Sequence, residues 1–408
     1  MHILFVHQNF PAQFGHVATH LARQRGVRCT FVSERAPGQS GGIERIQYRV
    51  RGGAIPRNHY CSRTFENAVW HTHAVYEALK GRPDLRPDLI VGHSGFGSTL
   101  FLRELYGDVP IVNYFEYFYQ PHDSDMDFRP DFPSTELNRL RARARNAMIL
   151  LDLENCDVGY SPTHWQRDRL PTAYRDKVQV VFDGVDTTIW RPMPIPDRRL
   201  NGIDLPKDAK LLTYAARGME SMRGFDVFMK VAKRLCERRD DLHVVIAGED
   251  RVCYGGDHMV TGGASFKQWV LAADDYDLSR FHFLGLIPPA DLARLFNLSD
   301  LHIYLTVPFV LSWSLMNALA CGATVLASDT APVREVIQHG KNGLLAGFFD
   351  IEGMADLADR VLNDPGGYAH LGDAGVAMIR DRFSMEVCLP RLLSLYERAM
   401  ANRRDEIA

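Results

Sequence analysis

The feature that most constrains the fold is the segment at residues 306–329, TVPFVLSWSLMNALACGATVLASD. An apolar run at 302–305 precedes it and predicts a buried strand. A loop with Ser312 and Ser314 follows, then a helix-like stretch that ends at Gly322 and a second β-rich run. This order is a βαβ unit, which requires a parallel sheet. A helix start of this kind directs unpaired N–H groups at the loop and favours an anion. An ordinary crossover helix without a ligand is the alternative interpretation.

The rest of the chain repeats the alternation of strands and helices. It predicts doubly wound α/β domains, whose ligands bind beyond the carboxyl ends of parallel strands. Gly15, His93 and Glu116 are expected at such ends. Two alternatives stay open: Gly15 only allows a turn, and His93 is an ordinary strand-end histidine. Glu116 stands among aromatic residues, where burying a carboxylate without a partner is costly, so a functional role is favoured.

Three further segments define the expected organisation. Residues 137–153 are predicted as one long helix, whose alternating arginines between 139 and 145 indicate a solvated face. A proline-dense stretch at 191–197 predicts a linker. The chain is expected to finish with two helical segments, at 354–362 and 384–402.

Composition narrows the class of protein. The 408 residues are enough for two domains, and the net charge of −3 gives no field that favours nucleic acid. Seven cysteines without C-x-x-C pairs are typical of reduced thiols. No apolar run reaches the roughly 18–20 residues of a membrane span, and the chain starts directly in a strand rather than a signal peptide. We therefore expect a cytoplasmic protein.

Two arginines carry the chemical argument. Arg217 and Arg223 flank a turn of small and flexible residues between a predicted strand and a helix. Guanidinium groups bind phosphate oxygens in pairs and neutralise a leaving diphosphate. With the helix start near Ser314, they predict a cationic clamp for an anion. The chain has no P-loop motif and no strict G-x-G-x-x-G, which disfavours P-loop kinases and simple dinucleotide enzymes.

A metal site is a weaker alternative. Cys253, Asp257 and His258 lie in a glycine-rich loop, but isolated side chains of this kind more often bind no metal. The one near match to an acidic D-x-D triplet, at residues 123–125, falls in a polar loop rather than at a strand end. We expect neither a metal nor a cofactor.

The arginines belong to a longer pattern. Its parts are Arg217-x5-Arg223-Gly224-Phe225, Ala247-Gly248-Glu249-Asp250, Phe283-x-Gly285, residues 312–322, Ser328-Asp329-x3-Val333-x-Glu335-Val336-Ile337 and Asn342-Gly343-Leu344-Leu345, joined in the first half by Gly15, His93 and Asp183-Gly184-Val185-Asp186. With this pattern the chain resembles the family 4 retaining glycosyltransferases, of group 1 type and GT-B fold. The resemblance covers nearly the whole chain.

The resemblance implies a fold and a division into domains. GT-B proteins have two Rossmann-like doubly wound domains that face a central cleft, and a C-terminal helix that crosses back to the first domain. We accordingly expect an acceptor-binding domain at 1–190, a linker at 191–208, a nucleotide-sugar-binding domain at 209–383 and the returning helix at 384–408.

The resemblance also implies site residues. His93 is expected to meet the donor sugar, and Arg217 and Arg223 to hold the diphosphate; these three form the expected catalytic set. The expected donor-binding residues are Gly15, Gly248, Glu249, Leu284, Gly285, Ser312, Trp313, Ser314, Leu315 and Asn317. The expected acceptor-side residues are Gln13, Phe14, Glu116 and Tyr117.

Two positions depart from the family pattern. The usual pair of glutamates, eight residues apart, falls on Phe309 and Asn317. Phenylalanine cannot replace the contact of the first glutamate with the donor sugar. Asparagine can accept one hydrogen bond from a ribose hydroxyl but carries no charge. In the family the leaving phosphate is thought to act as the base, so these losses do not by themselves abolish catalysis.

The expected function is transfer, with retention and without a metal, of a sugar from a UDP- or GDP-sugar to an acceptor hydroxyl in polysaccharide, glycolipid or glycoconjugate synthesis. The acceptor and the oligomeric state stay open, as does a peripheral contact of the N-terminal domain with a membrane. A catalytically weak or idle nucleotide-sugar-binding protein is the first alternative, motivated by Phe309 and Asn317. A GT-B nucleotide-sugar epimerase is the second, although no acid/base pair of carboxylates is evident.

Overall fold

The computed structural model describes the backbone of residues 1–407 and the side chains of residues 1–401. The chain divides into two compact units. Unit 1 comprises residues 1–184 together with the C-terminal segment that begins at Met385, and unit 2 is Val185–Ser384. No helix in the described part of the chain combines the length and apolar character that a bilayer span needs.

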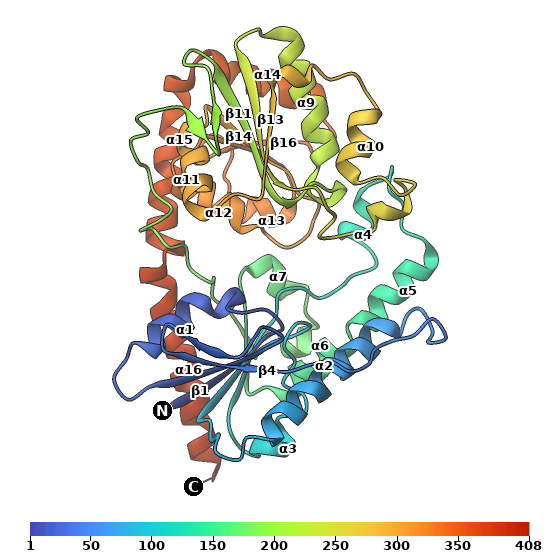
Figure 1. The fold of residues 1–408 in the computed structure, drawn as a ribbon, viewed down its shortest axis with the longest axis vertical. Coiled ribbons are helices and arrows are strands. Elements are labelled where there is room, and N and C mark those ends of the chain that lie inside the picture. The colour runs from blue at the N-terminus through green and yellow to red at the C-terminus, as the bar shows by residue number, and fades with distance from the viewer. Residues whose placement is uncertain (408) are drawn as a thin grey trace. The chain divides into compact units, whose positions relative to one another are not determined.

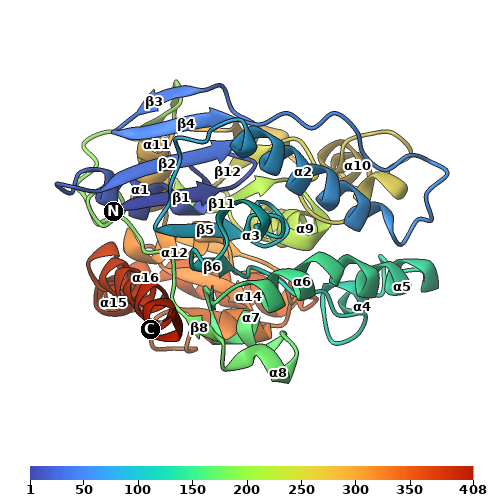
Figure 2. The ribbon, with the colours of Figure 1, turned by 90° about the horizontal axis from the view of Figure 1, so that it is seen from below.

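Unit 1 is built on a sheet of eight strands in the order β3-β4-β2-β1-β5-β6-β7-β8 (Figure 2). The strands are β1 His2–Val6, β2 Arg28–Ser33, β3 Gly38–Ser40, β4 Ile43–Gln47, β5 Leu89–His93, β6 Ile111–Tyr114, β7 Val158–Ser161 and β8 Val178–Val180. All neighbours are parallel except β3, which pairs antiparallel with β4 at the edge. The carboxyl ends of β5, β6 and β7 therefore lie side by side.

Helices cover both faces of this sheet. They are α1 Gly15–Ala22, α2 Arg63–Lys80, α3 Arg103–Tyr106, α4 Asp125–Phe128, α5 Glu136–Arg145, α6 Ala147–Asn155, α7 His164–Asp168, α8 Thr172–Arg175 and α16 Met385–Ile407, with a 3-10 turn η1 at Ala12–Phe14. Ile3 and Phe5 of β1 share a buried cluster with Leu395 of α16, whereas Leu4 shares a second cluster with Leu79 of α2. Helix α16 thus completes the core of unit 1.

Unit 2 is built on a parallel sheet of six strands in the order β13-β12-β11-β14-β15-β16. The strands are β11 Lys210–Gly218, β12 Leu242–Glu249, β13 Phe281–Gly285, β14 Leu301–Tyr304, β15 Val325–Ser328 and β16 Leu344–Ala346. The helices are α9 Phe225–Arg238, α10 Phe266–Ala272, α11 Pro289–Leu298, α12 Trp313–Ala320, α13 Ala331–Arg334, α14 Ile351–Asn363 and α15 Pro365–Met378. Figure 1 shows α11 and α12 on one side of this sheet and α9 on the other.

The predicted βαβ unit is confirmed. Strands β14 and β15 are parallel neighbours, and α12 connects them. The helix begins at Trp313, because Ser312 is its N-cap and accepts a hydrogen bond from the backbone N–H of Ser314 at 3.2 Å.

Three predictions of local structure are wrong. The predicted helix at 137–153 is two helices, α5 and α6, divided at Asn146. The Asn146 amide accepts from the backbone N of Tyr119 at 2.9 Å and donates to its carbonyl at 2.7 Å, and this tertiary contact anchors the break. The arginines of α5 are not one solvated face, because Arg145 lies over the Tyr119 ring at 3.6 Å. Between the two predicted C-terminal helices lies a third, α15.

Residues 191–208, predicted as a linker, lie within unit 2 and form a short antiparallel pair, β9 Arg199–Leu200 with β10 Ile203–Asp204. The returning helix begins at Met385 and belongs to unit 1.

The packing of α15 against α12 generates a test. A Cβ atom at Gly372 would lie 2.2 Å from the backbone oxygen of Gly322, just after α12. We expect Gly372→Ala to destabilise the protein by about 1–3 kcal/mol through overpacking. Gly366→Ala in the same helix is the matched control, since its Cβ would approach no atom closer than 3.9 Å. Thermal unfolding of both variants decides, and equal melting temperatures would contradict the close approach of these elements.

Candidate functional site

The predicted donor-binding residues of unit 2 lie at one edge of its sheet. Arg217 is at the end of β11, Gly248 and Glu249 end β12, and Leu284 and Gly285 end β13. Because these strands are parallel neighbours, their carboxyl ends meet at the same edge. The loop that follows β14 brings Ser312, Trp313 and Ser314 to that edge as well.

A tight turn places Arg223 at this edge. The turn is a 3-10 helix, η2 Ser221–Arg223, and Gly224 then starts α9 in the left-handed conformation with φ of 61°. A Cβ atom on Gly224 would lie 2.8 Å from the Cβ of Leu305, so the position requires glycine on both counts. The pattern Arg-Gly-Phe thus reflects a backbone constraint next to the cation.

The guanidinium of Arg223 is buried, with 6% of the residue exposed. Its Nη1 donates to the Tyr304 hydroxyl at 3.3 Å, the Thr306 hydroxyl at 2.8 Å and the Val310 carbonyl at 3.1 Å. Nε and Nη2 donate no hydrogen bond to any of the described residues. One side of the guanidinium is therefore fixed by the protein, and the other keeps donors available for an anion.

The Tyr304 hydroxyl connects this cation to the start of α12. The same oxygen accepts a hydrogen bond from the backbone N–H of Ser312 at 3.0 Å. Ser312 in turn caps α12, and its hydroxyl lies 2.8 Å from that of Ser314. The helix start and the buried cation are consequently held in a fixed relation, as an anion clamp requires.

The remaining predicted donor residues differ in exposure. Arg217 is exposed, with no ion pair recorded in the described residues, and Trp313 is 38% exposed. Leu315 is fully buried in the core, so its side chain is not available to a ligand. Asn317 lies in the second turn of α12 and is 8% exposed, and its side-chain amide bonds to none of the described residues.

His93 ends β5 in unit 1 and is completely buried. Its ring lies 4.7 Å from Tyr114, 5.1 Å from His7 and 5.0 Å from Phe96 between centroids. Neither ring nitrogen has a hydrogen-bond partner among the described residues, although Nε2 lies 3.7 Å from a Glu116 oxygen. Burial, and then His7, lower the pKa of His93 well below its usual value, so the ring is neutral near pH 7. It can donate or accept one hydrogen bond.

The acceptor-side predictions meet different outcomes. Phe14 is fully buried among Phe5 and Phe31, so its side chain supports the turn before α1 and is not available to an acceptor. Gln13 is half-buried in that turn, and Gly15 begins α1. Glu116 keeps a 24% exposed side chain.

Tyr117 is buried and donates from its hydroxyl to Asp125 at 2.7 Å. Burial, and then Asp125, raise the pKa of Tyr117 well above its usual value. Tyr117 therefore stays protonated and serves as a hydrogen-bond donor inside unit 1.

A buried network that sequence reasoning missed holds the loop after His93. Asp152 of α6 accepts hydrogen bonds from the hydroxyls of Ser94 and Ser98, both at 2.8 Å. Burial raises the pKa of Asp152 to about 6, although the serine bonds lower it. The sequence could not predict this network, because the spacing of Ser94, Ser98 and Asp152 does not indicate that α6 packs against the loop.

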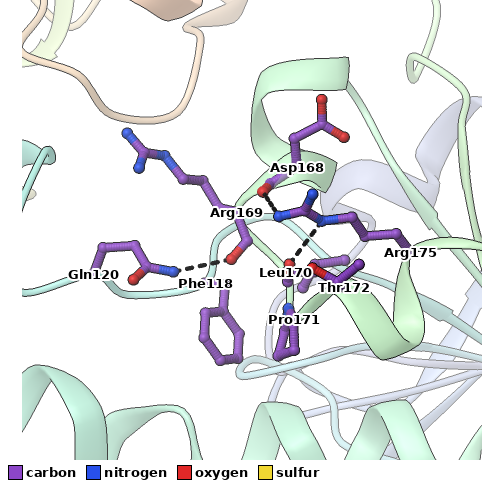
Figure 3. Close-up of a pocket in the computed structure, with 8 residues that line it drawn as sticks. All are labelled: Phe118, Gln120, Asp168, Arg169, Leu170, Pro171, Thr172 and Arg175. Atoms are coloured by element: carbon purple, nitrogen blue, oxygen red, sulfur yellow. Dashed lines mark hydrogen bonds between the residues drawn. The ribbon is translucent and has the colours of Figure 1, made fainter.

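Unit 1 also has a pocket of about 350 Å³ beyond β6 and β7 (Figure 3). It is lined by Phe118, Gln120, Asp168, Arg169, Leu170, Pro171, Thr172 and Arg175. Arg175 donates to the carbonyls of Leu170 at 3.0 Å and Asp168 at 2.5 Å, and Gln120 donates to the carbonyl of Arg169 at 3.0 Å. In Figure 3 the Arg169 guanidinium extends away from this turn. The pocket adjoins Tyr117 in sequence, and none of its residues was predicted.

Comparison with protein families gives two matches. The glycosyl transferase family 4 group model matches residues 25–190, and the glycosyl transferases group 1 model matches residues 199–378. The chain belongs to the family 4 glycosyltransferases of group 1.

Curated relatives of this family 4 chain include two proteins named D-inositol 3-phosphate glycosyltransferase. The one from Thermobifida fusca is 27% identical over 237 residues, which cover 55% of this chain and 50% of the relative. The one from Mycobacterium bovis is 26% identical over 234 residues, which cover 56% and 45%. The chain therefore matches about half the length of these relatives.

Solved structures show the same fold. Sucrose-phosphate synthase from Thermosynechococcus elongatus matches with a TM-score of 0.73 and 18% identity, over 98% of this chain and 99% of that one. Anabaena HepE, solved with UDP-glucose, matches with a TM-score of 0.67 and 14% identity, over 97% and 99%. The predicted GT-B fold, with two Rossmann-like units and a C-terminal helix in unit 1, is confirmed.

Phe309, one of the two departures from the family pattern, is buried beside Arg223. Phe309 is 7% exposed, and its ring lies 5.9 Å from the guanidinium of Arg223 and 5.3 Å from the Tyr254 ring. Tyr254 itself lies 5.5 Å from that guanidinium. In this family 4 chain the rings of Phe309 and Tyr254 thus both contact the buried cation.

The residues of the metal alternative lie in the loop after β12, where Asp257 bonds to the turn that carries Arg223. The Asp257 carboxylate accepts two hydrogen bonds from Ser221, one from its backbone N–H at 2.7 Å and one from its hydroxyl at 2.5 Å. The described residues contain no group of three or more His, Cys, Asp or Glu side chains suited to a metal. All seven cysteines are free thiols.

Proposed function

We propose that the protein is a retaining glycosyltransferase that moves a sugar from a nucleotide-diphosphate-sugar, a UDP- or GDP-sugar, to an acceptor hydroxyl. One observation supports this most: the buried Arg223 is fixed through Nη1 to three oxygens, while its other nitrogens donate to no acceptor in the described part of the chain. A guanidinium held in this way presents donors to a diphosphate without reorganisation.

In this proposal unit 2 binds the donor. Arg223, with Arg217 at the end of β11 and the first turn of α12, neutralises charge on the diphosphate as it leaves. In unit 1 the neutral ring of His93 can offer a hydrogen bond to a sugar hydroxyl. Its nitrogens have no partner in the described residues, and Glu116 lies beside it.

The acceptor belongs to unit 1. The pocket beyond β6 and β7 is lined by both charged and polar side chains, which suits a polar, hydroxyl-rich molecule better than an apolar one. Two curated relatives are named for a phosphorylated polyol, D-inositol 3-phosphate. Arg169 is the pocket residue whose charge best fits a phosphate on such an acceptor.

A nucleotide-sugar-binding protein without turnover is the second candidate, because Phe309 occupies the place of a sugar-contacting glutamate and packs on Arg223. A panel of UDP- and GDP-sugars distinguishes the two. Calorimetric binding together with donor hydrolysis or transfer supports the enzyme. Binding without turnover of any donor supports the second candidate.

The first prediction from the proposed function concerns Arg223. We expect Arg223→Ala to remove a charge-assisted contact of about 1.5–3 kcal/mol and to lower donor affinity at least about tenfold. Arg223→Lys should retain part of the affinity, since the charge stays but the planar fork is lost. The control is Arg238→Ala, because Arg238 is on α9 and pairs with Glu352 and Asp356. Normal donor affinity in a folded Arg223→Ala variant would remove this residue from the site.

The second prediction concerns metal ions. We expect full transfer activity after chelation, because two arginines and the start of α12 already supply positive charge to the diphosphate. Activity is measured with a chelator and again after addition of Mg²⁺ or Mn²⁺. A loss that either ion restores would show that the protein needs a metal.

The third prediction concerns Asn317, the position of the family's second glutamate. Burying a carboxylate there is costly without a partner, so Asn317→Glu should lower the melting temperature of the free protein. If ribose hydroxyls meet this side chain, the charged acceptor should raise donor affinity severalfold, by about 1 kcal/mol. Calorimetry on both variants decides. Weaker binding would mean that the ribose contact of the family does not apply to this chain.

A further inference from the structure

Glu220 stands at the start of the turn that carries Arg223, and it is completely buried. One carboxylate oxygen, Oε2, accepts hydrogen bonds from the backbone N–H groups of Cys253 and Tyr254, the latter at 2.9 Å. The backbone carbonyl of Glu220 accepts from the N–H of Arg223 at 3.3 Å and of Phe225 at 3.2 Å. A single residue therefore bonds to both the turn and the loop after β12.

A second carboxylate joins the same turn to the same loop. Asp257, on the loop after β12, accepts two hydrogen bonds from Ser221 of the turn. The loop bonded to Glu220 also carries Tyr254, whose ring contacts the guanidinium of Arg223. The position of Arg223 thus depends on the loop at 253–257, and the loop depends on Glu220.

The other carboxylate oxygen of Glu220, Oε1, has no hydrogen-bond partner among the described residues. A buried carboxylate satisfied on only one oxygen holds its proton readily. Burial raises the pKa of Glu220 to about 7, although the two N–H bonds and Arg223 lower it. The charged or titratable groups that act on it are Tyr214 of β11, Arg223 of η2, Arg251 and Cys253 of the loop, and Asp257, which begins the 3-10 turn η3 Asp257–Met259.

Tyr214, Cys253 and Arg223 keep one protonation state near neutral pH. Burial raises the pKa of Cys253 and places that of Tyr214 well above its usual value, so both are neutral at pH 7. Arg251 is paired with Glu249 at 2.7 Å. Arg223 keeps its charge, with its pKa raised further.

We propose that Glu220 is a positioning residue of the diphosphate site: it joins the turn that carries Arg223 to the loop that carries Tyr254, and it takes up a proton when a diphosphate binds. The inference rests on the proposed function. The physical reason is that a diphosphate at Arg223 brings negative charge close to the Glu220 carboxylate, and like charge favours the protonated form. Binding and proton uptake are then linked.

The sign of the pH dependence follows. A bound anion raises the pKa of Glu220 above its value in the free protein, so the complex holds more protons than its components. Donor affinity should rise as pH falls from about 8.5 through 7 and level off below. A rise of one pKa unit on binding corresponds to about a tenfold change in affinity between the two limits.

UDP-glucose and GDP-mannose are suitable probes, because the phosphates of a nucleotide-sugar carry no proton that titrates near pH 7. Calorimetric titrations of the full chain at pH 6 to 8.5, in two buffers with different heats of ionisation, measure affinity and proton uptake together. The wild type should take up part of a proton near pH 7.

Two substitutions separate the role of the charge from that of the hydrogen bonds. Glu220→Gln keeps an acceptor for the loop and removes the charge. We expect its affinity to be independent of pH, without proton uptake, and at pH 8.5 up to about tenfold above the wild type. Glu220→Ala leaves two buried N–H groups without an acceptor, and its affinity should fall at least about tenfold at every pH. Glu237→Gln, on the exposed side of α9, is the control and should behave as the wild type.

The outcomes distinguish this inference from the function on which it rests. If the wild type binds a nucleotide-sugar with no proton uptake, the inference is wrong and the proposed function stands. If Glu220→Gln retains the pH dependence of the wild type, another group takes the proton and the inference is again wrong. If no nucleotide-sugar binds to the wild type, the proposed function fails first. The wild-type measurement decides even where a variant does not fold.

Discussion

The burial of the Arg223 guanidinium determines how the loops at the carboxyl edge of the unit 2 sheet are arranged. Removing a guanidinium from water is costly unless oxygens and aromatic faces replace its hydration. Here the replacements come from several elements: Tyr304 at the end of β14, Thr306 and Val310 in the loop that follows, and the Tyr254 ring from the loop after β12. Each must stand close to Arg223, so the loop between β14 and α12 has little freedom. The same Tyr304 hydroxyl fixes Ser312, and the helix start follows.

Close backbone approach is the second condition for this edge. Gly224 has no Cβ to meet Leu305, and Gly248 has none to meet the carbonyl oxygen of Ala216, which would lie 2.5 Å away. On the far end of α12, Gly372 allows α15 to contact the backbone at Gly322. The helix start at the site is therefore fixed from both ends of α12. Glycines far apart in sequence contribute to one geometry because each removes a steric obstacle.

The sequence predicted what depends on local periodicity and missed what depends on tertiary contact. The βαβ unit around α12 was predictable because a buried strand, a capping serine and a terminal glycine all indicate it. Helix α15 was missed because its glycines, among them Gly366 and Gly372, have low helix propensity, and only packing compensates for it. The break between α5 and α6 was missed because it depends on the contact of Asn146 with Tyr119. Arg223 was predicted from its motif. Its partners Tyr304 and Tyr254, and the buried Glu220, were not, because no spacing brings their loops together.

Phe309 and Glu220 together determine how much negative charge lies near the Arg223 guanidinium. At Phe309, the position where the resemblance implies a glutamate, this chain has a ring that contacts Arg223 and carries no charge. Among the groups that raise the pKa of Arg223, the carboxylate is Glu220, which lies in the turn itself. A carboxylate that is buried and held by backbone N–H groups cannot leave its place to contact a sugar. It can respond to an incoming diphosphate only by changing its protonation, since the alternative is an unpaired negative charge next to another. In this chain the negative charge near the cation therefore serves the geometry of the turn, and in the proposed function sugar recognition falls to other side chains.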